Sequence, residues 1–266
     1  MDINIIIGYF GALLVGVTLG LIGSGGSILS LPIFVYFFGI NPVIATAYSL
    51  FTVGLTSLIG SIKNIKSKLI DINTVTYFST SAALSVYLTR KYLIGLIPEN
   101  IISIGNLLIT KEKFLMLFFC ILIYCAGIAM IKNRSDNSSK NKRNLKYHKL
   151  FVFIEGSLVG VITGVVGAGG GFIIIPVLVI FSKLKMKNAV ATSLLIISIK
   201  SLIGFIGDIE SLKINWIFLL KFSIISIIGI SIGQGLSKKI DGSKLKKGFG
   251  LFVIVIGTIV LIKEVI

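Results

Sequence analysis

The sequence predicts an all-α, polytopic membrane protein built as two inverted repeats, each with about five hydrophobic segments and a glycine-broken hairpin. Hydrophobic residues make up 55% of the 266-residue chain, charged residues only 14%, and the mean hydropathy is +1.02. A soluble domain carries about 25% charged residues. The apolar runs also have the length of helices, unlike the short alternating strands of an outer-membrane barrel. Glycine-rich breaks at matching places in the two halves complete the prediction.

Ten apolar segments follow one another along the chain. They lie at 4–22, 26–39, 43–62, 73–89, 114–131, 150–166, 170–182, 188–206, 215–236 and 248–262. Most approach the ~20 residues that a helix needs to cross the hydrocarbon core. The segments 26–39 and 170–182 are shorter, and each follows a glycine-rich break. Each broken pair could be two crossings or a re-entrant hairpin, so eight and ten crossings both stay open.

The distribution of lysine and arginine predicts the orientation. The linker 132–149 is the most basic loop and is expected in the cytoplasm, because cytoplasmic loops accumulate these residues. Its basic residues are Lys132, Arg134, Lys140, Lys142, Arg143, Lys146 and Lys149. If each broken pair crosses an even number of times, the lysine-rich loops near 63–68, 183–187 and 238–247 share its side. If each broken pair is instead counted as a single crossing, the lysines and arginines are spread almost evenly over the two sides, and the positive-inside bias disappears. Both termini then face outward from a multi-pass protein of the inner (plasma) membrane.

The two halves align without a gap at an offset of 144 residues. Three domains follow: a first transmembrane repeat at 1–131, a basic cytoplasmic linker at 132–149 and a second transmembrane repeat at 150–266. Because each half holds an odd number of segments, the second is expected upside down relative to the first. Inverted repeats with glycine-interrupted helices are typical of secondary transporters. The matching residues include Gly16-Val17 with Gly160-Val161, Pro32 with Pro176, and Ala47-Tyr48-Ser49-Leu50 with Ala191-Thr192-Ser193-Leu194.

The glycine clusters are the first candidate binding site. Irregular backbone inside a membrane survives where it lines a cavity or binds a ligand. A helix that begins after such a break points its amide groups and the positive end of its dipole at the gap, which favours an anion. Close helix packing is the competing explanation and suits the flanking Gly-x-x-x-Gly pairs better. The predicted anion-binding glycines are Gly23, Gly25, Gly26, Gly167, Gly169 and Gly170.

Hydroxyl and charged side chains inside the segments extend this candidate site. Ser49, Thr192 and Ser193 could donate hydrogen bonds to an oxyanion, or could equally bond to their own helix. Lys200 lies deep in segment 188–206 and is predicted to attract the anion; its counterpart Thr56 is uncharged. Coupling to a proton or sodium ion would need a carboxylate, for which Glu155 and Asp208 are the candidates.

Several function classes are not supported by the sequence. The only histidine, His148, lies in the linker, and no cluster of acidic residues occurs in the segments, so we expect neither an enzyme nor a metal site. Cys120 and Cys125 share one apolar run and indicate no disulfide framework. No nucleotide-binding motif is present, so no cofactor is expected. The net charge of +16 follows from membrane topology and does not require a nucleic acid.

These motifs resemble the sulfite exporter TauE/SafE family of membrane permeases. The resemblance rests on the stretch from Gly20 to Pro32, its repeat from Gly164 to Pro176, and the Ala-x-Ser-Leu element after each. It implies a secondary carrier, without ATP, for a small sulfur-containing or organic anion such as sulfite or a sulfonate. A passive anion channel and a non-transport accessory subunit remain the alternatives. The expected partners are thus a small anion and the lipid bilayer; the oligomeric state stays open.

Overall fold

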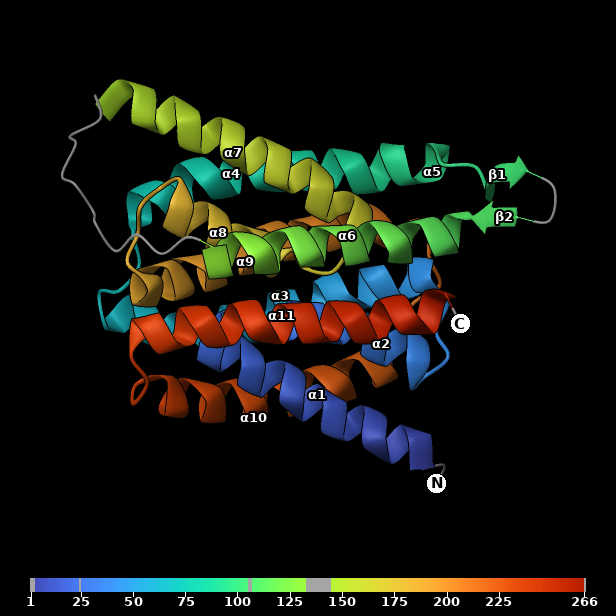
Figure 1. The fold of residues 1–266 in the computed structure, drawn as a ribbon, viewed down its shortest axis with the longest axis horizontal. Helices are drawn as coiled ribbons and strands as arrows, with labels where there is room; N and C mark the ends of the chain where they lie inside the picture. Colours follow the sequence, from blue (N-terminus) through green and yellow to red (C-terminus); the bar gives the residue numbers. More distant parts are fainter. Residues whose placement is uncertain (1–2, 24, 105–106, 133–144, 266) are drawn as a thin grey trace.

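The computed structural model describes residues 3–23, 25–104, 107–132 and 145–265, and helices account for most of them (Figure 1). The helices are α1 (Ile3–Ile22), α2 (Gly25–Tyr36), α3 (Pro42–Lys66), α4 (Ile72–Leu88), α5 (Ile94–Leu96), α6 (Lys111–Lys132), α7 (Leu145–Val166), α8 (Gly171–Ile180), α9 (Met186–Ile209), α10 (Trp216–Ser237) and α11 (Gly242–Val265). A π-helical turn, η1 (Thr89–Leu93), joins α4 to α5. The strands β1 (Asn100–Ile104) and β2 (Leu107–Thr110) form an antiparallel hairpin.

Each of the ten predicted apolar segments is a helix, so the polytopic helical fold class is confirmed. Six helices of the described chain are long and apolar enough to cross a membrane: α1, α3, α6, α9, α10 and α11. The helices after the glycine breaks are short, with 12 residues in α2 and 10 in α8. Both contain a proline, Pro32 or Pro176, which removes one helical hydrogen bond. The short helices α2 and α8 therefore agree with the interrupted segments that the sequence predicts after each glycine-rich break.

The two ends of the bundle differ in charge. Both termini and the β-hairpin lie at one end (Figure 1). The loops after α3, α8 and α10 lie at the other, which we call the lysine-rich end because Lys63–Lys68, Lys183–Lys187 and Lys238–Lys247 cluster there. Of the predicted linker 132–149, residues 133–144 fall outside the described chain, and α7 already begins at Leu145. The placement of both termini opposite the lysine-rich loops is the arrangement that the positive-inside rule favours.

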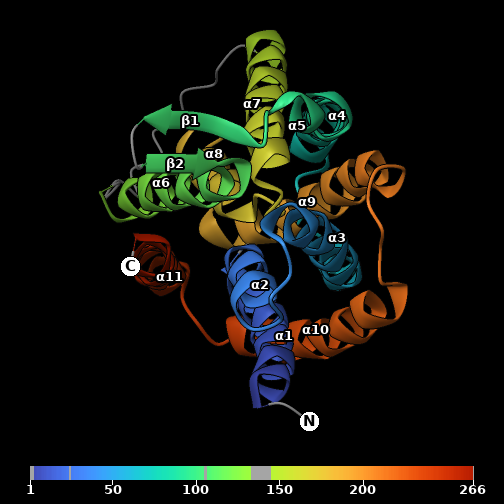
Figure 2. The same cartoon turned by 90° about the vertical axis from the view of Figure 1, so that its right-hand side faces the viewer.

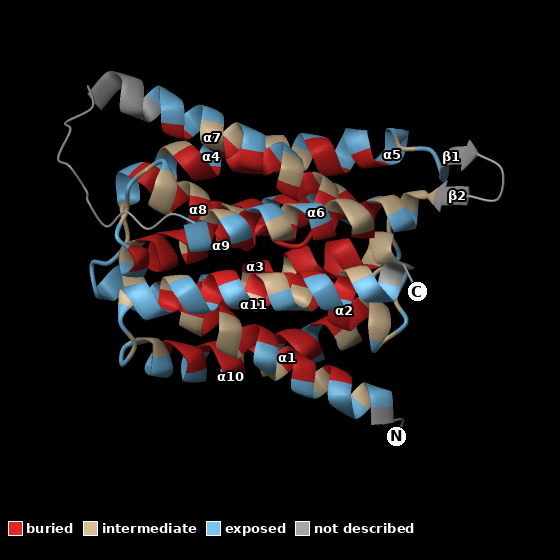
Figure 3. Cartoon of the chain, viewed as in Figure 1, coloured by how far each residue is buried: buried red, intermediate tan, exposed pale blue. Residues whose placement is uncertain are grey.

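Helices from the two halves pack against one another in exchanged pairs. α1 packs on α10, and α7, which stands in the place of α1 in the second half, packs on α4. α3 packs on α9, and α6 on α11 (Figure 2). A two-fold relation between the halves would produce this exchange of partners. The observed helix pairs therefore support the inverted repeat, which remains a prediction. Of the six long helices, α3 and α9 are the most deeply buried (Figure 3).

Glycines allow α1 and α10 to approach closely. A Cβ added to Gly16 would lie 1.9 Å from the carbonyl oxygen of Ser226, and one added to Gly233 would lie 2.1 Å from that of Val17. Small residues at such crossings let helix backbones meet, the role expected for the Gly-x-x-x-Gly pairs. The packing explanation thus holds for these glycines.

Substituting Gly233 tests this crossing, and Gly235 provides a matched control on the same helix. An added Cβ at Gly235 meets nothing within 4 Å. We expect Gly233→Ala to lower the melting temperature of the detergent-solubilised protein, because overpacking costs about 1–3 kcal/mol. Gly235→Ala should leave it unchanged or raise it, since alanine is the better helix former. Equal melting temperatures for the two variants would contradict the close crossing.

Candidate functional site

Left-handed glycines form both predicted breaks. Gly23 follows the last residue of α1 with φ of +81°, and Gly167, Gly169 and Gly170 have φ of +67°, +65° and +61°. Residues with a side chain rarely adopt this conformation, whereas glycine does so at little cost. The chain therefore turns sharply after α1 and after α7, and the predicted backbone breaks are confirmed.

Each break rests on the central helix of the opposite half. A Cβ on Gly23 would lie 2.8 Å from the Val190 side chain in α9, and one on Gly167 would lie 2.1 Å from Thr46 in α3. These contacts are equivalent under the 144-residue offset. The inner parts of the two breaks meet, because a Cβ on Gly169 would lie 3.3 Å from the Cβ of Ser27 in α2. Gly25 and Gly26 are buried at the start of α2.

The side chain of Lys200, a residue of α9, reaches the beginning of α8. Its side chain is fully buried, and its Nζ donates a 2.8 Å hydrogen bond to Thr163 Oγ1 in α7. A Cβ on Gly170, the residue that precedes α8, would lie 2.9 Å from Lys200 Nζ and 2.0 Å from the Thr163 side chain. The structure thus brings three residues together: Gly170 and Lys200, which the sequence indicated, and Thr163, which it did not.

The first turn of α8 adds hydrogen-bond donors beside Lys200. The Gly170 carbonyl accepts from the N–H groups of Ile173 and Ile174, at 3.1 and 3.3 Å. The N–H groups of Gly171 and Phe172 come earlier in the helix, where no intrahelical acceptor is available. The positive end of the helix dipole lies here as well. The buried amino group of Lys200 and the N-terminus of α8 therefore meet at the same point.

The predicted hydroxyl groups are engaged with the protein. Ser49 Oγ lies 2.6 Å from Ser30 Oγ, and Ser193 donates to the carbonyl oxygen of Val190 at 2.9 Å beside Gly23. Thr192 Oγ1 accepts from the Asp71 N–H at 3.1 Å. These contacts show the helix-bonding and bridging roles that the sequence left open for the three residues. Substrate binding by them remains a prediction.

The contact of Thr192 has an equivalent in the other half. Tyr48, which aligns with Thr192, accepts from the N–H of Asn215 at 2.7 Å. Asp71 and Asn215 are the N-cap residues of α4 and α10, and each side chain accepts from an N–H in the first turn of its helix. The Ala-x-Ser-Leu elements therefore hold the start of the fourth helix of the opposite half.

Four further hydroxyl groups line α3 and α9 without a hydrogen-bond partner among the described residues. All four are fully buried, and polar groups buried in that way are normally satisfied. Val53, which lies among them on α3, contacts Gly169. These hydroxyls give the centre of the bundle unused hydrogen-bonding capacity near the second break. They belong to Thr52, Thr56, Ser57 and Ser201.

The two predicted coupling carboxylates occupy different surroundings. Glu155 is partly buried on α7 and accepts a 3.4 Å hydrogen bond from Ser182, just past the end of α8. Asp208 is buried on α9 and forms an ion pair with Arg90, whose Nη2 lies 2.6 Å from Oδ2 and whose Nε donates at 2.7 Å. Neither carboxylate forms a salt bridge with Lys200 in the described chain.

Arg90 lies just beyond the apolar segment predicted at 73–89, and the structure places it inside the bundle. The helix that begins at Ile72 does not end at Leu88, because the π-helical turn η1 carries it onward. Arg90 is therefore only 3% exposed, and its Nη1 donates to Thr46 Oγ1 at 3.0 Å. The helical structure thus continues past the end of the predicted apolar segment, which brings Arg90 into the packed interior.

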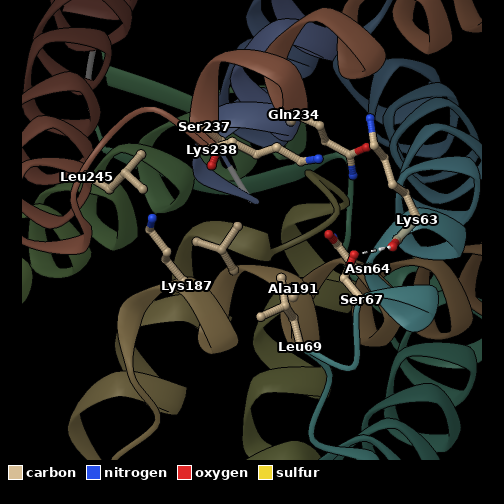
Figure 4. A pocket seen from close by; sticks show the side chains of 12 residues that line it. Lys63, Asn64, Ser67, Leu69, Lys187, Ala191, Gln234, Ser237, Lys238 and Leu245 are labelled. Atoms are coloured by element: carbon tan, nitrogen blue, oxygen red, sulfur yellow. Dashed lines mark hydrogen bonds between the residues drawn. The ribbon is translucent and has the colours of Figure 1, made fainter.

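A pocket of about 190 Å³ opens at the lysine-rich end (Figure 4). Lysines approach it from α3, α9 and the end of α10, namely Lys63, Lys187 and Lys238. Gln234 lies among them and donates a 2.6 Å hydrogen bond to the carbonyl oxygen of Gly60. Val190 also lines the pocket and contacts Gly23, so one residue of the pocket wall packs on the first glycine break.

Comparisons with known proteins agree with this architecture. The model of the family described as sulfite exporter TauE/SafE matches residues 9–260. The chain is 29% identical over 257 residues to a "Probable membrane transporter protein" of Xylella fastidiosa, with 93% of this chain and 91% of that protein covered. It is 23% identical over 267 residues to the "Probable membrane transporter protein YunE" of Bacillus subtilis, with 92% and 93% covered.

No solved structure matches the chain. The relatives are named as transporters rather than enzymes, and the family match spans almost the whole chain. The helices, the glycine breaks and these matches lead to one conclusion. The chain is a multi-pass membrane transporter that belongs to the sulfite exporter TauE/SafE family.

Proposed function

We propose that the protein is a secondary carrier for a small oxyanion, such as sulfite or a sulfonate, and that it binds this anion between Lys200 and the N-terminus of α8. Membership of the TauE/SafE family supports transport and the sulfur oxyanion class. The observation that carries the binding mode is the fully buried amino group of Lys200 beside Gly170, which a bound anion would hold in the charged form.

The charge of Lys200 calls for a counter-ion. Burying a charged group without a partner of opposite charge is costly. The salt bridges of the described chain join Arg90 to Asp208 and Lys91 to Glu210, so Lys200 takes part in neither. The N-terminus of α8 adds positive potential rather than compensating for it. A bound anion would compensate for both, whereas a cation or neutral solute would compensate for neither.

The donors at this point suit the oxygens of an oxyanion. Lys200 offers N–H groups beyond the one it gives to Thr163, and the N–H groups of Gly171 and Phe172 have no intrahelical acceptor. Backbone amides at a helix N-terminus bind sulfate-like and carboxylate groups in this way. Glycine at position 170 lets the side chains of Thr163 and Lys200 approach the start of α8, because a Cβ there would lie 2.0 and 2.9 Å from them.

Only the second half supplies this combination. In the first half the positions of Gly170, Thr163 and Lys200 are taken by Gly26, Leu19 and Thr56. A Cβ on Gly26 would lie 2.5 Å from the Leu19 side chain, so the same packing recurs with apolar atoms. We therefore propose one anion site per chain, formed at the second break, with the first break providing the opposing wall at Ser27.

Replacing Lys200 tests the proposal, with the exposed Lys221 of α10 as the control. We expect Lys200→Met to abolish stabilisation by sulfite in a thermal-shift titration and to reduce sulfite exchange in proteoliposomes about tenfold or more. A hydrogen bond to a charged group contributes about 1.5–3 kcal/mol, and 1.4 kcal/mol is a tenfold change in affinity. Without ligand, this variant should melt at a higher temperature, because an uncompensated buried charge has been removed.

Lys221→Met should retain both responses to sulfite. Stabilisation by a ligand follows its affinity for the folded state, so the titration reports binding directly. The same titration with thiosulfate, a sulfonate and a carboxylate ranks the anions. Unchanged sulfite binding and exchange in folded Lys200→Met would overturn the binding mode. Stabilisation by cations alone would overturn the substrate class.

Replacing Gly170 distinguishes the loss of the anion site from the effect of backbone strain, and Gly39 is the control for strain alone. Both glycines have φ of +61°, but a Cβ on Gly39 would meet nothing within 4 Å. We expect Gly39→Ala and Gly170→Ala both to lower the melting temperature, since a left-handed conformation costs a side-chain-bearing residue about 1–2 kcal/mol. Only Gly170→Ala should lose the response to sulfite. An equal loss in both variants would point to strain rather than to the site.

A further inference from the structure

We propose that the Arg90–Asp208 ion pair is the closed gate of the transport path, and that the pocket at the lysine-rich end is the equivalent gate in its open state. This inference rests on the proposed carrier function and adds a mechanism for access to Lys200 from each side in turn. It follows from comparing what the two halves place at equivalent positions.

The gate and the pocket use residues that are related by the same offset of 144. Around the ion pair, Arg90 binds Asp208, Thr46 and the carbonyl oxygen of Gly164. The residues at the equivalent positions all line the pocket. The four pairs are Arg90 with Gln234, Asp208 with Asn64, Thr46 with Val190, and Gly164 with Gly20.

Helix packing supports this equivalence independently of the alignment. A Cβ on Gly164 would lie 2.8 Å from Thr89, the residue before Arg90. A Cβ on Gly20 would lie 2.9 Å from Gly233, the residue before Gln234. The two crossings, α7 with α4 and α1 with α10, therefore bring the same register positions together. One crossing ends in a sealed ion pair, and the other ends in an open pocket.

The chemistry of the two ends fits a closed and an open state. The side chains of Arg90 and Asp208 are 0% and 4% exposed, so the pair fills its end of the bundle. In the pocket, Gln234 donates to Gly60 rather than to Asn64, which leaves the two amides apart. An amide pair can close by a hydrogen bond, because each amide both donates and accepts. If the pocket closed while Arg90 and Asp208 separated, the anion site would lose access to the lysine-rich side and gain access to the other side.

Helix α9 places the anion site between these two ends. Val190 lines the pocket, Lys200 binds at the break and Asp208 forms the ion pair. At a rise of 1.5 Å per residue, Lys200 lies about 15 Å from Val190 and about 12 Å from Asp208 along the helix. Val190 and Asp208 lie on the same face of α9, because 18 residues make about five full turns, and Lys200 lies about 80° around the helix from both. An anion at Lys200 is thus separated from both solutions by about half of the helix.

A buried ion pair is suited to a gate rather than to stability. Removing two charges from water offsets much of their attraction, so such a pair adds little net stability. Water that enters the opening end would solvate both groups and lower the cost of separating them. The gate can therefore open without a large change in the stability of the fold.

Thiol labelling tests the gate without requiring a substrate. In a Cys120→Ala, Cys125→Ala background, Thr46→Cys would touch Arg90, and Val190→Cys would line the pocket. Sealed vesicles of both orientations are treated with a membrane-impermeant thiol reagent that carries a trimethylammonium group and so lies outside the proposed substrate class. We expect Val190→Cys to react from the lysine-rich side and Thr46→Cys to react from neither side.

Neutralising the gate should change this pattern. Arg90→Gln with Asp208→Asn gives the closed end the residues of the pocket, and labelling of Thr46→Cys from the opposite side should rise about tenfold or more. Exchanging the charges, Arg90→Asp with Asp208→Arg, should restore slow labelling. Conversely, Gln234→Arg with Asn64→Asp should slow labelling of Val190→Cys. If the neutral variant does not fold, the Gln234→Arg, Asn64→Asp variant still tests the gate from the pocket side.

The outcomes separate the gate from the proposed function. Fast labelling of Thr46→Cys in the parent would overturn the gate even if sulfite still binds. Unchanged labelling in both the neutral variant and the Gln234→Arg, Asn64→Asp variant would do the same. The expected labelling without any response to sulfite would leave the gate in place and overturn the proposed substrate. Labelling of Thr46→Cys from both sides in the neutral variant would indicate a continuous channel and would also contradict alternating gates.

Discussion

The buried amino group of Lys200 is the constraint on which the arrangement of the centre depends. It lies where α8 begins, so two sources of positive potential meet in a part of the bundle that is shielded from water. The backbone accommodates them only because Gly170 carries no side chain. Among the described residues, Thr163 provides the hydrogen bond that fixes the Lys200 amino group. The break, the short helix and the lysine thus form one structural unit.

Helix α9 links this unit to both ends of the protein. It is among the most deeply buried of the long helices, and it packs on α3 across the boundary between the halves. One end of α9 lines the pocket through Val190, and the other end carries Asp208. The two repeats supply the same scaffold at each end but different side chains. In the proposed transport path, the end with Arg90 and Asp208 is closed, and the end with Gln234 and Asn64 at the equivalent positions is open.

Much of the fold was predictable from the sequence because hydrophobic length and glycine clusters are local signals. The ten apolar segments and the breaks at Gly23 and Gly167 could be located without tertiary information. Lys200 could be singled out because a charge inside an apolar run is unusual. Arg90 could not, since its burial depends on a π-helical turn that extends α4. Thr163 could not either, because one threonine in an apolar helix carries no signal.

The most direct test of the anion site is the location of a heavy analogue of the proposed substrate. Selenite resembles sulfite in charge and shape, and selenium gives an anomalous signal in a crystal of the complex. We expect one main peak within hydrogen-bond reach of Lys200 Nζ and the N–H groups of Gly171 and Phe172. A structure in which selenite occupies only the lysine-lined pocket, with Lys200 still bound to Thr163 alone, would contradict the proposed site.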